Sequence, residues 1–204
     1  MTDCSDCSVG TSDDAKTRID QIADAALRRF SRYGFKRSSM DDIAKEAGLA
    51  KATLYLHFKS KDDIFRAMIR RFGARVETRC HEVMAQKAPF REKLTALMDA
   101  HFGAGYAAFG AGEHLPELKA VITAIASREI EDHEGVFVAL ALRLLREGDA
   151  AGEISLKRVD PEPIVWTLIR AAIGAKMGTP PSPEIYAERL RQAVAVAAAA
   201  VDVA

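Results

Sequence analysis

The sequence predicts an all-α protein of about nine helices, with a small N-terminal domain of three helices followed by a larger helical domain. Apolar residues recur at spacings of three and four along most of the chain, which is the period of amphipathic helices. Turn residues, mainly Gly and Pro, separate these periodic stretches, and no run of useful length shows the alternation of a strand. At 204 residues the chain is long enough to bury a sizeable core.

The first expected helix runs from Ser12 or Asp13 to about Tyr33. Its apolar residues in the range 19–30 follow the helical period and form one continuous stripe. Gly34 then ends the helix. We expect this stripe to cover the two short helices that follow and to supply the core of a small bundle.

The first twelve residues form a tail that is rich in Ser, Asp and Gly, and we expect it to be disordered. The tail contains Cys4 and Cys7 in a Cys-x-x-Cys arrangement, but no second pair and no histidine at metal-ligand spacing follows. Cys80 stands alone and is expected to pack in a helix. Three cysteines in this arrangement predict neither a disulfide framework nor a metal site.

Three short helical segments are expected within residues 38–63, and a tight turn separates the first two. Ser39 is a suitable N-cap for the first of them, and Gly48 suits a left-handed residue just after its end. Leu49 and Leu54 then point into a small core. A helix, a turn containing Gly and a second short helix is the plan of a helix-turn-helix, whose second helix enters the major groove of DNA. An ordinary helical hairpin has the same spacing.

Residues 18–65 carry a longer set of motif positions, which are Ile19, Ala25-Ala26, Phe30, Tyr33-Gly34-Phe35, Ser39, Ile43-Ala44, Ala47-Gly48 and Thr53-Leu54-Tyr55-Leu56-His57-Phe58-Lys59-Ser60-Lys61. In this order and spacing they closely resemble the N-terminal DNA-binding domain of the TetR family of bacterial transcriptional regulators. The resemblance covers roughly a quarter of the chain. It implies an all-α fold in which a C-terminal helical domain binds an effector and forms a dimer.

The distribution of charge agrees with this reading, although the net charge is zero. Residues 15–75 contain fifteen Lys and Arg against seven Asp and Glu, whereas residues 76–204 contain fourteen against eighteen. A basic N-terminal third beside a mildly acidic remainder is typical of a DNA-binding module joined to another domain.

The remaining helices are defined by their caps and by Pro and Gly. Ser60 is expected to cap a long fourth helix, with Asp63 completing a weak capping box. The other expected helices lie at about residues 90–109, 116–125, 128–146, 162–177 and 184–201. We therefore expect a tail at residues 1–12, a helix-turn-helix domain at 13–62 and an effector-binding and dimerisation domain at 63–204.

The resemblance places the DNA-facing positions mainly on the second helix of the helix-turn-helix. The expected DNA-binding residues are Ser39, Lys51, Ala52, Thr53, Tyr55, Leu56, His57, Lys59 and Lys61. Lys, Thr and His side chains can bond base edges or phosphate, and Leu56 can touch a thymine methyl group. Tyr55 and His57 can alternatively pack against the first helix. Ala50 departs from the family, which often has Ser or Thr there, so a hydroxyl cap is missing.

The last two helices are expected to form a dimer interface, because a recognition helix this short needs a second copy to bind DNA specifically. The expected interface residues are Val165, Leu168, Ile169, Ala172, Ile185, Leu190, Ala193, Val194 and Ala197. A two-fold dimer predicts a palindromic operator on double-stranded DNA. The same apolar faces can alternatively belong to the core of one subunit.

An effector pocket in the C-terminal domain is implied by the resemblance alone. The candidate lining residues are Met98, His101, Phe102, Tyr106, Phe109 and Trp166. Their aromatic and apolar character favours a hydrophobic or aromatic effector, with His101 or Tyr106 as its polar contact. The same residues, at helical spacing, can equally form plain core.

Two other functions fit the sequence less well. A helical enzyme would need a nucleophile and base, a metal cluster or a phosphate loop, and the sequence shows none, so we expect no catalytic residue, metal or cofactor. A TetR-like protein without an effector, such as a nucleoid or division factor, is the second. The chain shows no signal-peptide core and no apolar run long enough to span a membrane, which predicts a cytoplasmic protein. A repressor is the family's commoner case.

Overall fold

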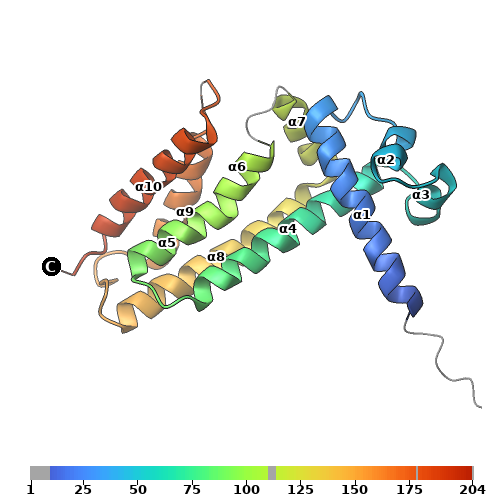
Figure 1. Ribbon diagram of the computed structural model, residues 1–204. Helices are drawn as coiled ribbons and strands as arrows, with labels where there is room; N and C mark the ends of the chain where they lie inside the picture. The colour runs from blue at the N-terminus through green and yellow to red at the C-terminus, as the bar shows by residue number, and fades with distance from the viewer. Residues whose placement is uncertain (1–9, 110–113, 178, 204) are drawn as a thin grey trace, which may run out of the picture. The chain divides into compact units, whose positions relative to one another are not determined.

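A computed structural model describes residues 10–109, 114–177 and 179–203 (Figure 1). Within these ranges the chain forms ten α-helices and one five-residue π-helical segment, and it forms no strand. The all-α prediction is confirmed, and the helix count is nine when α5, η1 and α6 are taken as one continuous helix. Cys4 and Cys7 lie outside the described residues.

The helices follow one another through mostly short connections. Their bounds are α1 Gly10–Tyr33, α2 Met40–Glu46, α3 Lys51–His57, α4 Lys61–Ala85, α5 Phe90–Met98, η1 Asp99–Gly103, α6 Ala104–Phe109, α7 Leu115–Ile125, α8 Ser127–Ala150, α9 Pro161–Gly174 and α10 Pro183–Ala199. The caps expected at Ser39 and Ser60 are confirmed, since each hydroxyl accepts a backbone N–H of the first turn. Ser182 caps α10 in the same way.

Spatial contacts divide the chain into two compact units. The first unit contains the described residues of 1–72 together with 114–129, and the second contains those of 73–113 and 130–204. The first turns of α4 therefore belong with α1, α2 and α3, and so does α7. The functional boundary that we expect at residue 62 remains a prediction.

The core of the first unit is built around three phenylalanine rings. Phe30, Phe35 and Phe65 lie with ring centroids 5.2 to 5.7 Å apart in tilted and edge-on arrangements. Such geometries suit the aromatic quadrupole and add to the hydrophobic gain of burial. Arg71 of α4 also forms ion pairs with Asp20 and Asp24 of α1. These contacts hold α1 against α4 and leave α2 and α3 as the outer pair of the unit.

The second unit is a helical assembly in which α10 packs against both α9 and α5 (Figure 1). Two tyrosines join its parts: the rings of Tyr106 and Tyr186 stack at 4.2 Å. The helix expected at about residues 90–109 is interrupted by the π-helical turn η1. A Cβ at Gly103 would meet the carboxylate of Asp99, which would then have to move.

Candidate nucleic-acid interface

The first helix of the helix-turn-helix, α2, begins with a complete capping box. The Ser39 hydroxyl accepts the Asp42 amide at 3.1 Å, and the Asp42 carboxylate accepts the Ser39 amide at 3.0 Å. These bonds satisfy two donors that a helix start leaves without partners. The bond from the Ser39 backbone to the carboxylate is the main reason that the pKa of Asp42 is lowered. Asp42 therefore serves the helix start, and Ser39 beside it is exposed.

The turn between α2 and α3 depends on Gly48. Its φ is +66°, in the left-handed region that residues with a Cβ rarely adopt. The Gly48 amide donates to the Lys45 carbonyl at 3.0 Å, and the Leu49 amide donates to the Ala44 carbonyl at 2.9 Å. This pair of bonds is the Schellman motif, which ends a helix and turns the chain sharply. The expected role of Gly48 is confirmed.

The second helix, α3, has one buried side and a broad exposed side. Leu54 is completely buried and anchors the helix on the core of the first unit. The Ala50 N-cap makes no side-chain bond, as its missing hydroxyl predicts. The helix is held by burial of Leu54, worth about 1.5–3 kcal/mol, and by the preceding turn.

The exposed side of α3 contains most of the predicted DNA-binding residues. The side chains of Lys51, Ala52, Tyr55 and Leu56 are exposed, and those of Thr53 and His57 are partly covered. Leu56 is 82% exposed and Tyr55 is 47% exposed, so Tyr55 does not pack into the bundle. The diameter of an α-helix with its side chains, about 10–12 Å, fits a major groove about 12 Å wide.

The Lys51 ammonium lies in a specific ion pair on this surface. Its Nζ is 2.9 Å from a carboxylate oxygen of Asp41 and 6.0 Å from the centre of the Tyr55 ring. The bond with Asp41 is the main reason that the pKa of Lys51 is raised. Asp41 thus holds Lys51 near Tyr55. Asp41 and Lys51 lie ten positions apart, so their spacing in the sequence gave no signal of this contact.

Lys61 differs from its predicted role. Its ammonium donates to the carbonyls of Phe35 and Ser38, at 2.8 and 3.0 Å, and lies 4.2 Å from the centre of the Phe35 ring. Partial burial lowers the pKa of Lys61. We therefore correct its assignment: this ammonium ties α4 to the connection between α1 and α2. Lys59, two residues earlier, is exposed.

A helix far along the chain also contacts the α1–α2 connection. The Lys36 amide donates to the carboxylate of Glu117, which lies on α7. Gly34 has a φ of +81°, and a Cβ there would collide with Glu117 and crowd the His114 ring. Arg66 of α4 donates to the Ile125 carbonyl at 2.8 Å. Sequence reasoning missed these contacts, because no local pattern indicates an association between residues 59 or 81 positions apart.

The predicted effector residues do not form one pocket in the second unit. Met98 is completely buried in the core. The Tyr106 hydroxyl donates to the Pro181 carbonyl at 2.7 Å, and its expected contact with an effector stays a prediction. His101 and Phe102 contact each other at a ring-centroid distance of 4.6 Å. Phe109 is partly covered.

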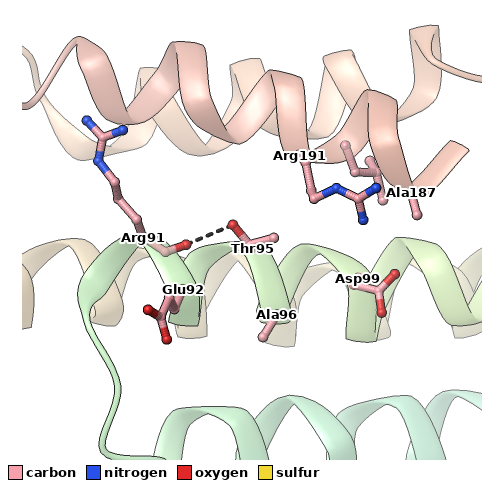
Figure 2. Close-up of a pocket in the computed structure, with 8 residues that line it drawn as sticks. Arg91, Glu92, Thr95, Ala96, Asp99, Ala187 and Arg191 are labelled. Atoms are coloured by element: carbon pink, nitrogen blue, oxygen red, sulfur yellow. Dashed lines mark hydrogen bonds between the residues drawn. The ribbon is translucent and has the colours of Figure 1, made fainter. Parts of the chain in front are cut away.

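Trp166 lies on α9 with 39% of its surface exposed and is not among the residues that line the two pockets described next, so its effector role stays a prediction. The first pocket, of about 450 Å³, is an open groove between α5 and α10 with the arginines Arg91 and Arg191 at its edges (Figure 2). The second, of about 10 Å³, is lined by His101 together with residues of α4 and α8.

Most of the predicted dimer residues are buried within the subunit itself. The side chains at 0 to 3% exposure are Val165, Leu168, Ile169, Ala172, Leu190 and Val194. They form the packing of α9 against α10 and the core of the second unit, so their assignment to an interface is corrected. Of the predicted set, Ile185 is 51% exposed, and Ala193 and Ala197 are partly covered.

Other apolar residues of the same two helices are exposed. Ile173 and Val196, on α9 and α10, are 54% and 75% exposed, and Trp166 lies on α9 as well. We call these four exposed residues, Trp166, Ile173, Ile185 and Val196, the outer face of α9 and α10. Periodicity identified the correct helices but not which of their apolar residues face outward.

Two general properties complete the description. In the described part of the chain, no group of three or more His, Cys, Asp or Glu side chains is placed to hold a metal ion. None of the described helices combines the length and apolar character needed to cross a bilayer.

Comparison with known sequences agrees with the geometry of the first unit. Residues 22–68 match the family described as bacterial regulatory proteins, tetR family. Over 82 residues the chain is 37% identical to the fatty acid metabolism regulator protein of Bacillus subtilis (strain 168), covering 40% of this chain and 42% of that protein. Over 88 residues it is 33% identical to the HTH-type transcriptional repressor KstR2 of Mycolicibacterium smegmatis (strain ATCC 700084 / mc(2)155), covering 43% of each. The match spans less than half the length of these curated relatives.

Solved structures extend the likeness in fold to most of the chain. A transcriptional regulator from Cytophaga hutchinsonii ATCC 33406 has a TM-score of 0.73 and 18% identity, covering 91% of this chain and 98% of that one. The transcriptional regulator FadR from Bacillus subtilis, in complex with stearoyl-CoA, has a TM-score of 0.61 and 22% identity, covering 87% and 96%. At these identities the likeness establishes the fold.

Proposed function

Because the chain belongs to the TetR family of bacterial regulatory proteins through its N-terminal domain, we propose that it is a sequence-specific regulator of transcription. It binds a palindromic operator as a dimer and represses transcription, as is commoner in the family, and a small, largely apolar effector releases it. The observation that carries the proposal is the exposed side of α3, where Leu56 is 82% exposed beside Lys51 and Tyr55.

Each residue on this side of α3 has a contact chemistry suited to DNA. Leu56 provides an apolar surface for a thymine methyl group, and Lys51 provides a donor for a guanine edge. The Tyr55 hydroxyl reaches a phosphate oxygen. Exposed Lys59, and the Lys36 and Arg37 side chains that precede α2, supply phosphate contacts that fix the position of the helix without reading sequence.

Two copies of the chain are needed, because one seven-residue helix buries too little area to select a site. We propose that the outer face of α9 and α10 pairs with the same face of a second copy. Apolar side chains that are half to three-quarters exposed, such as Ile173 and Val196, are costly in water and gain free energy when covered. A two-fold axis then presents two α3 helices to successive major grooves.

The effector acts by shifting the population of conformations. It prefers a conformation whose two α3 helices no longer match adjacent grooves. Operator affinity falls by the difference between the effector's binding free energies for this conformation and for the DNA-binding conformation. The continuous helix α4 is a suitable mechanical link, since residues 61–72 belong to the first unit and 73–85 to the second. An apolar effector is supported by the solved structure of a regulator of the same fold in complex with stearoyl-CoA.

The test is selection of bound sequences from a random double-stranded DNA library by the purified chain. We expect a palindrome whose half-sites are spaced by one helical turn or a multiple of it. Leu56→Ala should relax the preference at a thymine position, whereas Lys59→Ala should weaken binding to all sequences and lower the salt dependence. Binding that follows salt alone, with no sequence enriched, would contradict the proposal.

A further inference from the structure

The first turn of α2 carries two acidic residues that have different surroundings. Asp42 forms the capping box with Ser39, and its carboxylate lies 3.5 Å from the guanidinium of Arg29. The cap of α2 is complete without Asp41, whose side chain is half exposed. Its carboxylate is directed to Lys51 at the start of α3, with Nζ 2.9 and 3.0 Å from its two oxygens. The start of α2 thus leaves Asp41 available for another function.

A carboxylate at the position of Asp41 is unfavourable for a protein that simply attracts DNA. Phosphates repel it, and its ion pair with Lys51 cancels a positive charge on the exposed side of α3. An exposed ion pair of this kind contributes little to stability. Stability therefore gives no reason for a carboxylate here. Discrimination between DNA sequences does, because a charge that finds no partner penalises the wrong sequence.

Asp41 and Lys51 together present a hydrogen-bond acceptor beside a donor. The ammonium has three N–H groups and the carboxylate has two oxygens, so each keeps bonding capacity beyond the ion pair. The hydrogen bond with Asp41 raises the pKa of Lys51, so the donor is charged at pH 7. The ammonium also lies 6.0 Å from the centre of the Tyr55 ring, on the exposed side of α3. A base pair that approaches this side can reach both charged groups.

The major-groove edge of a G·C base pair has the complementary pattern. The cytosine N4 amino group is a donor, and the guanine O6 and N7 atoms beyond it are acceptors. The Watson–Crick hydrogen bond holds N4 and O6 about 2.9 Å apart. This separation matches the 2.9 Å between Lys51 Nζ and the nearer oxygen of Asp41. The carboxylate can therefore face N4 while the ammonium faces O6 and N7.

An A·T base pair fits the same two side chains less well. Its donor, adenine N6, lies between two acceptors, adenine N7 and thymine O4. A carboxylate that bonds to N6 therefore meets an acceptor on each side, and one ammonium can cover only one of them. Beyond cytosine N4 there is instead a C–H group, so a carboxylate at that atom has no such conflict. The two side chains thus favour G·C over A·T.

We propose that Asp41 and Lys51 together read one G·C base pair in each half-site of the operator. Asp41 accepts a hydrogen bond from cytosine N4, and Lys51 donates to guanine O6 and N7. The assignment rests on the proposed function, because it requires α3 to lie in the major groove. It adds a residue of α2 to those that select the sequence. At any other base pair the carboxylate finds no matching donor and is repelled by DNA, which lowers the affinity for other sequences.

Base preference measured with variants of the full chain tests the proposal. The unchanged chain selects bound sequences from a random double-stranded DNA library, and all four base pairs are then compared at every position of the selected site. We expect one G·C position in each half-site at which Asp41→Ala and Lys51→Ala each lower the preference by about tenfold. The double variant should also lose about tenfold, rather than the roughly hundredfold expected of independent contacts, because the two side chains act as one unit.

Binding to unrelated DNA should change in the opposite direction. Asp41→Ala frees the Lys51 ammonium for a phosphate, so affinity for unrelated DNA should rise and the slope of log affinity against log salt should steepen by about 1. Asp41→Asn keeps the size of the side chain and provides a second variant if Asp41→Ala does not fold. It should also lower the preference for G·C, because an amide pairs well with adenine N6 and N7.

Glu46→Ala is the matched control. Glu46 lies on the same helix as Asp41 and also forms an exposed ion pair, at 3.0 Å, but its partner is Arg28 of α1 rather than a residue of α3. This variant should leave every base preference unchanged. The proposal is wrong if the variants of Asp41 retain all base preferences. It is equally wrong if they change only positions at which Lys51→Ala has no effect.

The proposed function and the role of Asp41 fail in different ways in this experiment. If the unchanged chain selects no sequence from the library, the proposed function fails, and the role of Asp41 fails with it. If the unchanged chain selects a palindrome whose base preferences do not depend on Asp41, the proposed function stands and only the role of Asp41 is lost.

Discussion

At the scale of single residues, two lysines only two positions apart have different surroundings. Lys59 is exposed, whereas the Lys61 ammonium bonds to two carbonyls of the α1–α2 connection. The family resemblance predicts that both lysines bind DNA, because it identifies equivalent positions in the chain but not the contacts that each side chain makes. A bond to a backbone carbonyl 23 or 26 residues away leaves no trace in local spacing.

We expect replacement of Lys61 to reduce stability and replacement of Lys59 to reduce DNA binding. Lys61→Met should lower the free energy of unfolding by about 1–2 kcal/mol, because it removes charge-assisted bonds to the Phe35 and Ser38 carbonyls. Lys59→Met should leave stability unchanged and reduce the slope of log affinity against log salt by about 1. Urea unfolding and salt titration measure the two effects. Equal loss of stability in both variants would argue against the role given to Lys61.

His101 should make stability depend on pH. Burial lowers its pKa from 6.5 to about 4 in the folded chain, so the unfolded chain binds a proton first as pH falls. The contribution of the neutral imidazole is fully present above pH 6.5 and is lost progressively between 6.5 and 4. We expect the unchanged chain to lose up to about 3 kcal/mol more than His101→Gln across this window.

Urea unfolding at pH 7, 5.5 and 4, at fixed protein concentration, measures this difference. Carboxylates titrate in the same range in both chains, so the comparison with His101→Gln isolates the imidazole. Parallel pH profiles for the two chains would show that His101 is readily protonated in the folded state.

At the scale of elements, helix ends were the most predictable features. Ser39, Gly48, Ser60 and Ser182 behave as the sequence indicates, because caps depend on residues within one turn of each other. The π-helical turn η1 lies inside the single helix expected at about residues 90–109, because the spacing of apolar residues does not distinguish π-helical from α-helical bonding.

The missing hydroxyl at the start of α3 gives a prediction at this scale. Ala50 has an extended backbone, with φ −64° and ψ 145°, and makes no side-chain cap bond. We expect Ala50→Ser to stabilise the chain by about 0.5–1 kcal/mol, because its hydroxyl can accept a free amide of the first turn. Ala52→Ser, inside the same helix, should instead cost about 0.5 kcal/mol. Thermal or urea unfolding distinguishes the two; a gain in both variants would indicate another cause.

At the scale of the whole molecule, the sequence predicts which helices are amphipathic but not what covers each face. Val165 and Leu168 have the same helical period as an interface would, yet they pack within the subunit. The apolar residues that remain exposed, Ile173 and Val196, differ from them only in their position around the helix. Assigning a face to the core or to a partner requires knowledge of how α9 and α10 pack on each other.

This distinction supports a prediction about assembly. Ile173→Asp combined with Val196→Asp should convert a dimer into a monomer, because each carboxylate would lose its hydration when the outer face of α9 and α10 is covered. Ile130→Asp, which changes a residue on α8 that is 38% exposed, is the control and should leave the dimer intact. Sedimentation velocity measures the association state, and urea unfolding establishes that both variants fold.

The association state should also control DNA binding. A monomer presents a single α3 helix to one half-site, so the double variant should lose at least about tenfold in operator affinity while its salt-dependent binding to unrelated DNA changes much less. A folded double variant that still sediments as a dimer would place the interface on another surface. A monomer that binds the palindrome as tightly as the unchanged chain would show that one recognition helix suffices, which contradicts the need for two-fold symmetry on which the palindromic operator rests.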